Sequence, residues 1–409
     1  MLKKKTKLLF LNRSFWPDVE STGQFFGELC EELAKKYEVV FIAGRSYYKK
    51  DLPFKPFVLY RKESFLEIKI IRVRNTLFRK DNLSGRIINW LTYGALAFCV
   101  LIKENPKLIV VGTDPPFLGI LAMLNKWLKS VSYIYNCRDL YPDVAYALHK
   151  LNKGNILGRL FDYLNRMALN SSCKVVCLGE SMQQELRLKG VKSGDLLVIY
   201  DWVDTAMINP VAKEDNYLLK ELNLKGSFVI LYSGNLGLAQ DFTSFLESAC
   251  KIQERMSFSI VFIGDGAGKR RLQEKVVALG LKNVLFLPYQ SKENLSISLS
   301  MADLHLVPLA KGMAGAIVPS KVYGIMAAGR PFLAICDAES EPALIIKEFG
   351  CGLWVDPGNH KSVAESIIWA MDNPLAIKEM GLSGRKLAEE AFSKNILIKQ
   401  WFKLLEKMV

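Results

Sequence analysis

Short hydrophobic runs recur along the chain, each bounded by polar or turn residues and followed by a longer amphipathic segment. This alternation is typical of strand–helix–strand units, because a buried parallel strand is apolar throughout and its covering helix is apolar on one side. The first set of predicted strands covers residues 7–11, 38–43, 67–73, 108–111, 132–135 and 174–178. We expect these strands to form one parallel sheet.

The alternation pauses over residues 198–210 and then resumes, with predicted strands at 228–232, 259–263, 284–287, 304–308 and 331–335. A chain of 409 residues is also longer than a single core usually supports. We therefore predict an α/β fold with two Rossmann-like, doubly wound domains, over 1–203 and 204–386, that face a central cleft. Residues 387–409 are expected to form a helix that crosses back to the first domain.

Charge is distributed unevenly between the two halves. Residues 1–200 contain 32 Lys and Arg against 18 Asp and Glu, whereas residues 201–409 contain 23 of each, so the net charge of +14 lies in the first half. Basic residues cluster at 3–7 and again at 61–86. This pattern favours an anionic partner for the first domain, either anionic lipid, nucleic acid or a pyrophosphate-bearing substrate, although solubility alone would also explain it.

The cysteines indicate the cellular compartment, and two apolar stretches bear on contact with a membrane. The eight cysteines show no disulfide or zinc spacing, and no signal peptide opens the chain, so we expect a reduced, cytoplasmic protein. Residues 87–102 fall short of the length that spans a bilayer. This stretch and residues 117–128 could lie in the membrane interface, or could equally be helices buried against the sheet.

Polar residues in the first domain follow predicted strands, where open α/β sheets bind ligands. Thr22, Gly23 and Gln24 open the helix after the first strand, and a helix N-terminus with a small residue suits an anionic group. Asp114 follows the strand at 108–111, and Arg138 and Asp139 follow the strand at 132–135. These carboxylates could bind sugar hydroxyls or act as a base, but they could also be ordinary helix caps.

Two glycine-rich loops follow strands of the second domain. One contains Gly234, Asn235 and Gly237; the other contains Gly264 and Gly266 and leads to Lys269 at a helix start. Such loops suit a backbone that wraps a phosphate or a sugar. Neither loop matches the GxGxxG dinucleotide fingerprint or the GxxxxGK[ST] phosphate loop, so NAD chemistry and nucleoside triphosphate hydrolysis are disfavoured.

A third loop of the second domain begins a helix at Pro319, Ser320 and Lys321. A lysine at this position would form an anion site together with the helix N-terminus. A capped helix with a solvent-exposed lysine is the alternative interpretation.

These segments together resemble family 4 of the retaining glycosyltransferases with the GT-B fold, in the branch that builds bacterial surface polysaccharides. The similarity covers almost the whole chain, through FWPDVESTGQ, GTDPPF, RDLYPDV, DWVDTAMINP, YSGNLGLAQD, FIGDGAGK, ADLHLVPL and VPSKVYGIMAAGRP. The resemblance implies a nucleotide sugar, with a UDP-sugar favoured, bound in the second domain near Gly234, Asn235, Ser320, Lys321 and Tyr289. It also implies a lipid-linked or saccharide acceptor in the first domain, and transfer without a metal or other cofactor, in agreement with the absence of a D-x-D pair after any strand.

The chain departs from the family pattern where the family often has two glutamates, because Ala316 and Gly324 occupy those positions. Lys321 is therefore the first candidate for the diphosphate contact, and Glu341 is a possible substitute for the lost glutamates. We expect Arg138 and Asp139 to orient the acceptor for front-face attack with retention, on the inner face of the cytoplasmic membrane. A nucleotide-sugar epimerase and a non-catalytic, membrane-associated partner are the alternatives; nucleic-acid binding lacks a motif.

Overall fold

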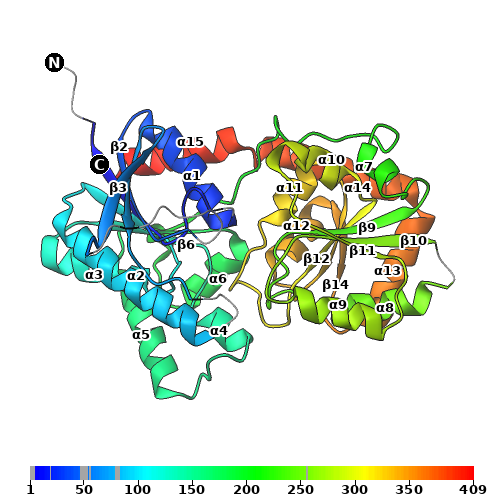
Figure 1. Ribbon diagram of the computed structural model, residues 1–409, viewed down its shortest axis with the longest axis horizontal. Coiled ribbons are helices and arrows are strands. Elements are labelled where there is room, and N and C mark those ends of the chain that lie inside the picture. The colour runs from blue at the N-terminus through cyan, green and yellow to red at the C-terminus, as the bar shows by residue number, and fades with distance from the viewer. Residues whose placement is uncertain (1–4, 19, 47–53, 55–56, 79–82, 255–256) are drawn as a thin grey trace. The chain divides into compact units, whose positions relative to one another are not determined.

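The computed structural model describes residues 5–409 except for 19, 47–53, 55–56, 79–82 and 255–256. Four of the clustered basic residues, Lys3, Lys4, Arg79 and Lys80, lie outside the described residues. The chain divides into two compact units (Figure 1). Unit 1 contains Met1–Tyr200 and Ile398–Val409, and unit 2 contains Asp201–Leu397.

Unit 1 is built on an eight-stranded sheet with the order β3-β4-β2-β1-β5-β6-β7-β8. Its strands are β1 (Lys7–Leu11), β2 (Glu38–Ala43), β3 (Tyr60–Phe65), β4 (Ile68–Val73), β5 (Leu108–Val111), β6 (Tyr133–Cys137), β7 (Lys174–Cys177) and β8 (Leu196–Val198). All six predicted strands are present. They pair in parallel, as predicted, and the sheet also has an edge strand that was not predicted, β3, which pairs antiparallel with β4. None of the β3 residues is buried, so the strand leaves no apolar run to recognise in the sequence.

Helices cover both faces of this sheet, with α2, α3 and α5 on one face and α1 and α15 on the other (Figure 1). On the second face, Trp401 of α15 is fully buried and packs edge-on against Phe25 of α1. The helices are α1 (Ser21–Ala34), α2 (Leu83–Lys103), α3 (Leu118–Lys129), α4 (Asp143–Ala147), α5 (Ile156–Ser171), α6 (Glu180–Leu188) and the terminal α15 (Lys394–Glu406), with a 3-10 turn η1 (Ser193–Asp195).

Among the described residues, one helix is long and apolar enough to cross a membrane by length and composition alone. It is α2, whose segment Ser84–Lys103 has a mean hydropathy of 1.5. The inner side of α2 belongs to the core, where Tyr93, Ala97 and Leu101 are fully buried. The Tyr93 hydroxyl donates a hydrogen bond of 2.9 Å to the carbonyl of Ile42 in β2. This inner side therefore contributes to the packing of unit 1.

Unit 2 is built on a six-stranded parallel sheet with the order β11-β10-β9-β12-β13-β14. Its strands are β9 (Phe228–Ser233), β10 (Phe258–Ile263), β11 (Val284–Leu287), β12 (Leu304–Pro308), β13 (Phe332–Ile335) and β14 (Gly352–Val355). The five predicted strands are present, and β14 is additional. Two sheets of mainly parallel strands with helical layers confirm the α/β fold class.

The helices of unit 2 bury apolar residues of both sheet faces, with a large cluster around Phe245, Phe262 and Ile367 and a smaller one around Leu219 and Met301. The predicted terminal helix is two helices, since Leu387 lies in α14 and α15 begins at Lys394. The helices are α7 (Tyr217–Glu221), α8 (Thr243–Ile252), α9 (Lys269–Ala278), α10 (Leu295–Ser300), α11 (Lys321–Ala327), α12 (Glu341–Phe349), α13 (His360–Asp372) and α14 (Pro374–Glu390), with a 3-10 turn η2 (Lys292–Asn294).

Strand register brings the candidate loops of each unit together. In unit 1, Leu11 of β1 is paired with Val111 of β5, and β6 lies beside β5, so the loops that follow these three strands are neighbours. In unit 2, Ser233 at the end of β9 is paired with Ile263 at the end of β10. The loops that begin at Gly234 and Gly264 therefore lie side by side.

Candidate functional site

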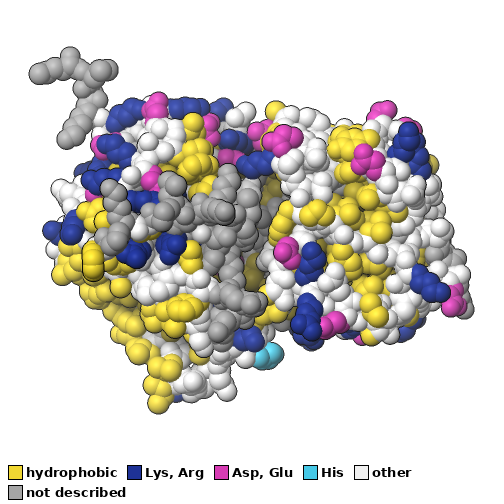
Figure 2. Space-filling view, in the orientation of Figure 1, with side chains coloured by type: hydrophobic (Ala, Val, Ile, Leu, Met, Phe, Trp, Pro, Cys, Tyr) yellow, Lys and Arg dark blue, Asp and Glu magenta, His cyan; other side chains and the backbone are white. Residues whose placement is uncertain are grey.

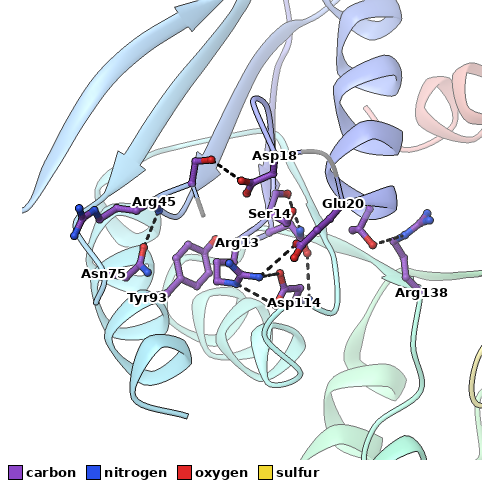
Figure 3. A network of polar contacts seen from close by, with 12 residues as sticks. Arg13, Ser14, Asp18, Glu20, Arg45, Asn75, Tyr93, Asp114 and Arg138 are labelled. Carbon is purple, nitrogen blue, oxygen red and sulfur yellow. Dashed lines mark hydrogen bonds and ion pairs between the residues drawn. The ribbon is translucent and has the colours of Figure 1, made fainter. Parts of the chain in front are cut away.

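The loop after β1 in unit 1 is held by an ion pair that the sequence did not predict. The Arg13 side chain is 7% exposed, and its Nη2 lies 2.9 Å from Asp114 Oδ2 and 3.6 Å from Glu20 Oε2. The Arg13 backbone N–H also donates a hydrogen bond of 2.7 Å to the Asp114 carbonyl. Asp114 thus joins two loops (Figure 3), and its carboxylate is largely engaged by Arg13.

Further polar contacts extend this network to the sheet edge. Ser46 donates a hydrogen bond of 2.6 Å to Asp18. Arg72, which is 1% exposed, donates to the carbonyls of Gly44 and Trp16 and pairs with Glu63. Arg72 belongs to the basic cluster at 61–86, so part of that cluster neutralises carboxylates of unit 1 itself and is not available to an external polyanion.

Arg138 and Thr22, two of the predicted site residues, are brought together from positions far apart in the sequence. Arg138 follows β6 and is 4% exposed; its Nε donates a hydrogen bond of 3.2 Å to Thr22 Oγ1 at the start of α1. Its guanidinium also lies 4.2 Å from the ring centroid of Phe25. Arg138 is therefore oriented over the first turn of α1, with part of its surface packed on an aromatic face.

The other predicted residues of unit 1 surround this turn. Gly23 lies in a tight place, since a Cβ there would be 3.0 Å from Ser14 Oγ and 3.4 Å from the Phe15 nitrogen. The Gln24 N–H donates the first hydrogen bond of helix α1, to the Glu20 carbonyl. Asp139 donates its backbone N–H to Thr113 Oγ1 at 3.3 Å, which links the loops after β6 and β5.

In unit 2, Lys321 is the first residue of α11, and its ammonium lies over an aromatic ring. Lys321 Nζ is 3.7 Å from the ring centroid of Tyr232, at the end of β9. The residue is partly buried, and desolvation lowers the pKa of the ammonium to about 7. No carboxylate among the described residues pairs with it. The structure therefore presents a poorly compensated cation at the carboxyl end of the sheet.

Tyr232 is the residue that sequence analysis missed, and it fixes this arrangement. Its ring is fully buried and packs edge-on against Phe242, and its hydroxyl donates a hydrogen bond of 2.6 Å to the Asn235 carbonyl. Gly234 lies close to both Lys321 and Tyr232, because a Cβ at Gly234 would be 3.4 Å from Lys321 Nζ and 3.9 Å from the Tyr232 hydroxyl. The available signal was an aromatic residue two positions before a glycine at a strand end.

The glycines of the two neighbouring loops have a packing role. A Cβ at Gly264 would lie 2.0 Å from the Gly234 carbonyl oxygen, and one at Gly266 would lie 2.5 Å from the Leu236 carbonyl oxygen. Their φ angles of 138° and 154° also favour glycine. Loop-on-loop packing therefore explains Gly264 and Gly266 without a ligand. Gly237 donates its N–H to Gln240 Oε1 within its own loop.

The remaining donor-site candidates lie in different surroundings. Tyr289 is 49% exposed, and its hydroxyl donates to the Asp265 carbonyl at 3.1 Å. Lys269 lies 3.8 Å from the exposed carboxylate of Asp265. Ser320 precedes α11 without a side-chain capping hydrogen bond, and Glu341 is 2% exposed in the first turn of α12.

The two positions that depart from the family pattern differ in the space around them. Ala316 is buried, whereas a Cβ at Gly324 would meet only Leu299 Cδ1, at 3.5 Å. Among the residues that the structure describes, no three His, Cys, Asp or Glu side chains gather into a group that could hold a metal ion. Lys321 is thus the cation that the described part of unit 2 offers at this place.

Comparison with known proteins matches both units to families of one enzyme class. Residues 22–202 match the glycosyl transferase 4-like domain and residues 215–387 match glycosyl transferases group 1. WcaI of Escherichia coli, a glycosyl transferase assigned to colanic acid biosynthesis, is 25% identical over 97% of this chain and 98% of its own.

Solved structures show the same fold at low sequence identity. Sucrose-phosphate synthase from Thermosynechococcus elongatus superposes with a TM-score of 0.77 at 15% identity, covering 99% of both chains. HepE of Anabaena, solved in complex with UDP, superposes with a TM-score of 0.73 at 14% identity, covering 98% of this chain and 100% of its own.

Proposed function

Because this chain belongs to the GT-B glycosyltransferases of polysaccharide biosynthesis, we propose that it transfers a sugar with retention from a UDP-sugar to a lipid-linked or saccharide acceptor. The observation that carries the proposal is Lys321, whose ammonium is desolvated over Tyr232 and has no carboxylate partner among the described residues. Burying a charge without compensation is costly. A diphosphate bound beside Gly234 supplies the missing negative charge.

UDP is the preferred nucleotide in this proposal because HepE, which shares the fold, was solved with UDP. Asn235 lies in the loop after β9 and Ser320 directly precedes Lys321, and both offer hydrogen-bonding groups for the diphosphate or the sugar. Tyr289, half-exposed beside the Gly264 loop, offers an aromatic surface for the base.

The reaction forms a bond between the acceptor oxygen and the anomeric carbon, and breaks the bond between that carbon and the phosphate oxygen. Attack comes from the face that the diphosphate leaves, so the configuration is retained. The acceptor's proton passes to an oxygen of the departing diphosphate. Protonated Lys321 stabilises the negative charge that grows on the leaving group, which is the kind of electrostatic help that often dominates catalysis. Side-chain charge in this role makes the transfer metal-independent.

Arg138, Thr22 and Gly23 bind the acceptor in this proposal. Arg138 is oriented by Thr22 and Phe25, and the positive end of the α1 helix dipole favours an anion such as an acceptor phosphate. Asp139, in the same loop as Arg138, orients the attacking hydroxyl. An acceptor carried on a lipid would require the enzyme to work at the cytoplasmic face of the membrane.

The donor assignment is tested by a thermal-shift panel of UDP-, GDP- and ADP-sugars, because a ligand that binds only the folded state raises its apparent stability. We expect a selective shift with one UDP-sugar that is lost in Lys321→Met. The absence of any shift would favour the non-catalytic partner. An altered sugar released without acceptor would instead indicate an epimerase.

The acceptor assignment is tested separately with Asp139→Ala. We expect a rise in the acceptor KM and a fall in kcat, with an unchanged thermal shift from the donor. Turnover equal to that of the unmodified protein would remove Asp139 from the mechanism. The anomeric configuration of the product, read by NMR, tests retention.

A further inference from the structure

Helix α5 of unit 1 carries large apolar side chains on its outer side, although its inner side is fixed by buried contacts. Asn165 on the inner side is 1% exposed, and its amide accepts a hydrogen bond of 2.8 Å from Tyr135 and donates to the Tyr141 carbonyl. The outer side carries large apolar side chains at helical spacing: Ile156 is 80% exposed, Leu157 68%, Leu160 51% and Tyr163 61%. A helix whose outer side faces water normally carries polar residues at such positions.

Helix α3, which packs beside α5, also exposes large apolar side chains. Asn125 is 1% exposed on the inner side, whereas Trp127 is 58% and Leu128 64% exposed. We call the outward residues of both helices the α3/α5 face; they are Trp127, Leu128, Ile156, Leu157, Leu160 and Tyr163. Figure 2 shows hydrophobic side chains gathered over these helices. Isolated exposed apolar residues are ordinary, but several of them on two neighbouring helices mark a surface that binds something.

The α5 helix cannot turn its apolar side inward without losing buried polar contacts. Lys189, at the end of α6, is buried, and its Nζ lies 2.8 Å from Asp143 in α4 and 2.9 Å from Asp162 in α5. Together with the Asn165 hydrogen bonds, this ion-pair group holds α5 in one rotation about its axis. The outward apolar side is thus a property of the folded unit.

Charges around the α3/α5 face are mainly positive. Residues 117–175 contain eight Lys and Arg against three Asp and Glu, and two of those acids are the partners of Lys189. Lys129, Lys153 and Arg159 are exposed near the apolar residues. A second copy of this surface would bring like charges together, whereas an anionic lipid surface would complement both the cations and the apolar side chains.

We propose that the α3/α5 face is a membrane-docking surface that inserts its leucines, isoleucine and aromatic residues at the level of the lipid headgroups of an anionic bilayer. Trp127 and Tyr163 are the residue types that favour this level. The surface lies in unit 1 and uses none of the proposed donor or acceptor residues. It therefore stands whether or not the donor assignment is correct.

The test is co-sedimentation of the full chain with phosphatidylcholine vesicles, with and without about one third phosphatidylglycerol. We expect at least tenfold stronger binding to the anionic vesicles, weakened by added salt. The double variant Leu157→Gln/Leu160→Gln should lower this binding by about tenfold or more. Leu375→Gln in unit 2, where Leu375 is 77% exposed, is the matched control and should bind as the unmodified protein does.

Thermal unfolding of the double variant should be unchanged, because both leucines are already exposed, and this separates loss of docking from loss of folding. Anionic-vesicle binding that persists in a folded double variant would overturn the proposal. So would equal binding to both vesicle types. A dimer that the double variant converts to a monomer, measured by light scattering, would show instead that the face joins two copies of the chain.

Discussion

The polar loops at the carboxyl ends of the two sheets balance their charge in different ways. In unit 1, Arg13 is paired with Asp114 and Glu20, and Arg72 with Glu63 and two carbonyls. In unit 2, Lys321 rests on the Tyr232 ring, and no carboxylate among the described residues pairs with it. A cation that is paired with carboxylates holds loops in place. A desolvated cation without such a partner is unfavourable by itself, so a ligand that brings a negative charge to it gains binding free energy. By this comparison Arg13 and Arg72 are structural residues of unit 1, whereas Lys321 is the residue that contacts a ligand in unit 2.

The largest effect should come from removing the uncompensated cation. Lys321→Met should lower kcat/KM by about a hundredfold or more, because it deletes charge stabilisation at the leaving group. Folding stability should not fall, since a desolvated ammonium is lost. Steady-state kinetics and thermal unfolding measure the two quantities. A large loss of stability in Lys321→Met would mean that the lysine is a structural residue, which would break the comparison.

The opposite result is expected for the compensated pair. Arg13→Met should destabilise unit 1 by about 2 kcal/mol, because it leaves the partly buried carboxylate of Asp114 without its partner. The thermal shift produced by UDP should persist in the fraction that folds. Denaturant unfolding followed by circular dichroism measures the change. If the stability of Arg13→Met were unaltered and donor binding were lost, Arg13 would be a residue that contacts the ligand and not a structural one.

The two glycine loops sharpen the comparison within unit 2. Gly264→Ala should cost about 2 kcal/mol or more, because its Cβ would meet the Gly234 carbonyl at 2.0 Å. At Gly234 the Cβ would meet the flexible end of Lys321 at 3.4 Å, so Gly234→Ala should fold better than Gly264→Ala and should weaken UDP binding. Thermal unfolding of the two variants, each with and without UDP, distinguishes packing from ligand contact. Equal stability of both would contradict this division.

The smallest effect is expected at a second lysine of the same unit, Lys269. Lys269 lies beside Asp265, whose side chain is 71% exposed, and such surface pairs contribute little. Lys269→Ala should change the donor KM by less than about threefold. It is the matched control for Lys321→Met, since both changes remove one positive charge at the start of a helix. If Lys269→Ala lost as much kcat/KM as Lys321→Met, both lysines would contribute to donor binding and the distinction between them would fail.

Sequence patterns predicted most of the strands and the loops that carry polar residues, because a buried parallel strand is a nearly continuous apolar run. They did not give β3, which has no buried residue, or the outward side of α5. The pairing of Arg13 with Asp114 and of Arg138 with Thr22 depends on which strands become neighbours. Local spacing carries no information about such long-range contacts, and the packing role of Gly264 was hidden for the same reason.

The most direct test of the account is proton uptake on UDP binding at pH 8. Desolvation lowers the pKa of Lys321 to about 7 in the free protein, so most of the ammonium is deprotonated at pH 8. A bound diphosphate favours the charged form and raises this pKa. Binding should therefore take up most of one proton at pH 8, and UDP affinity should fall as the pH rises above 7.

Calorimetric titration of UDP in two buffers with different ionisation enthalpies measures this uptake. The account predicts about one proton for the unmodified protein and close to none for Lys321→Met. Binding of UDP without proton uptake, or the same uptake in Lys321→Met, would show that the uncompensated cation of unit 2 is not the partner of the diphosphate.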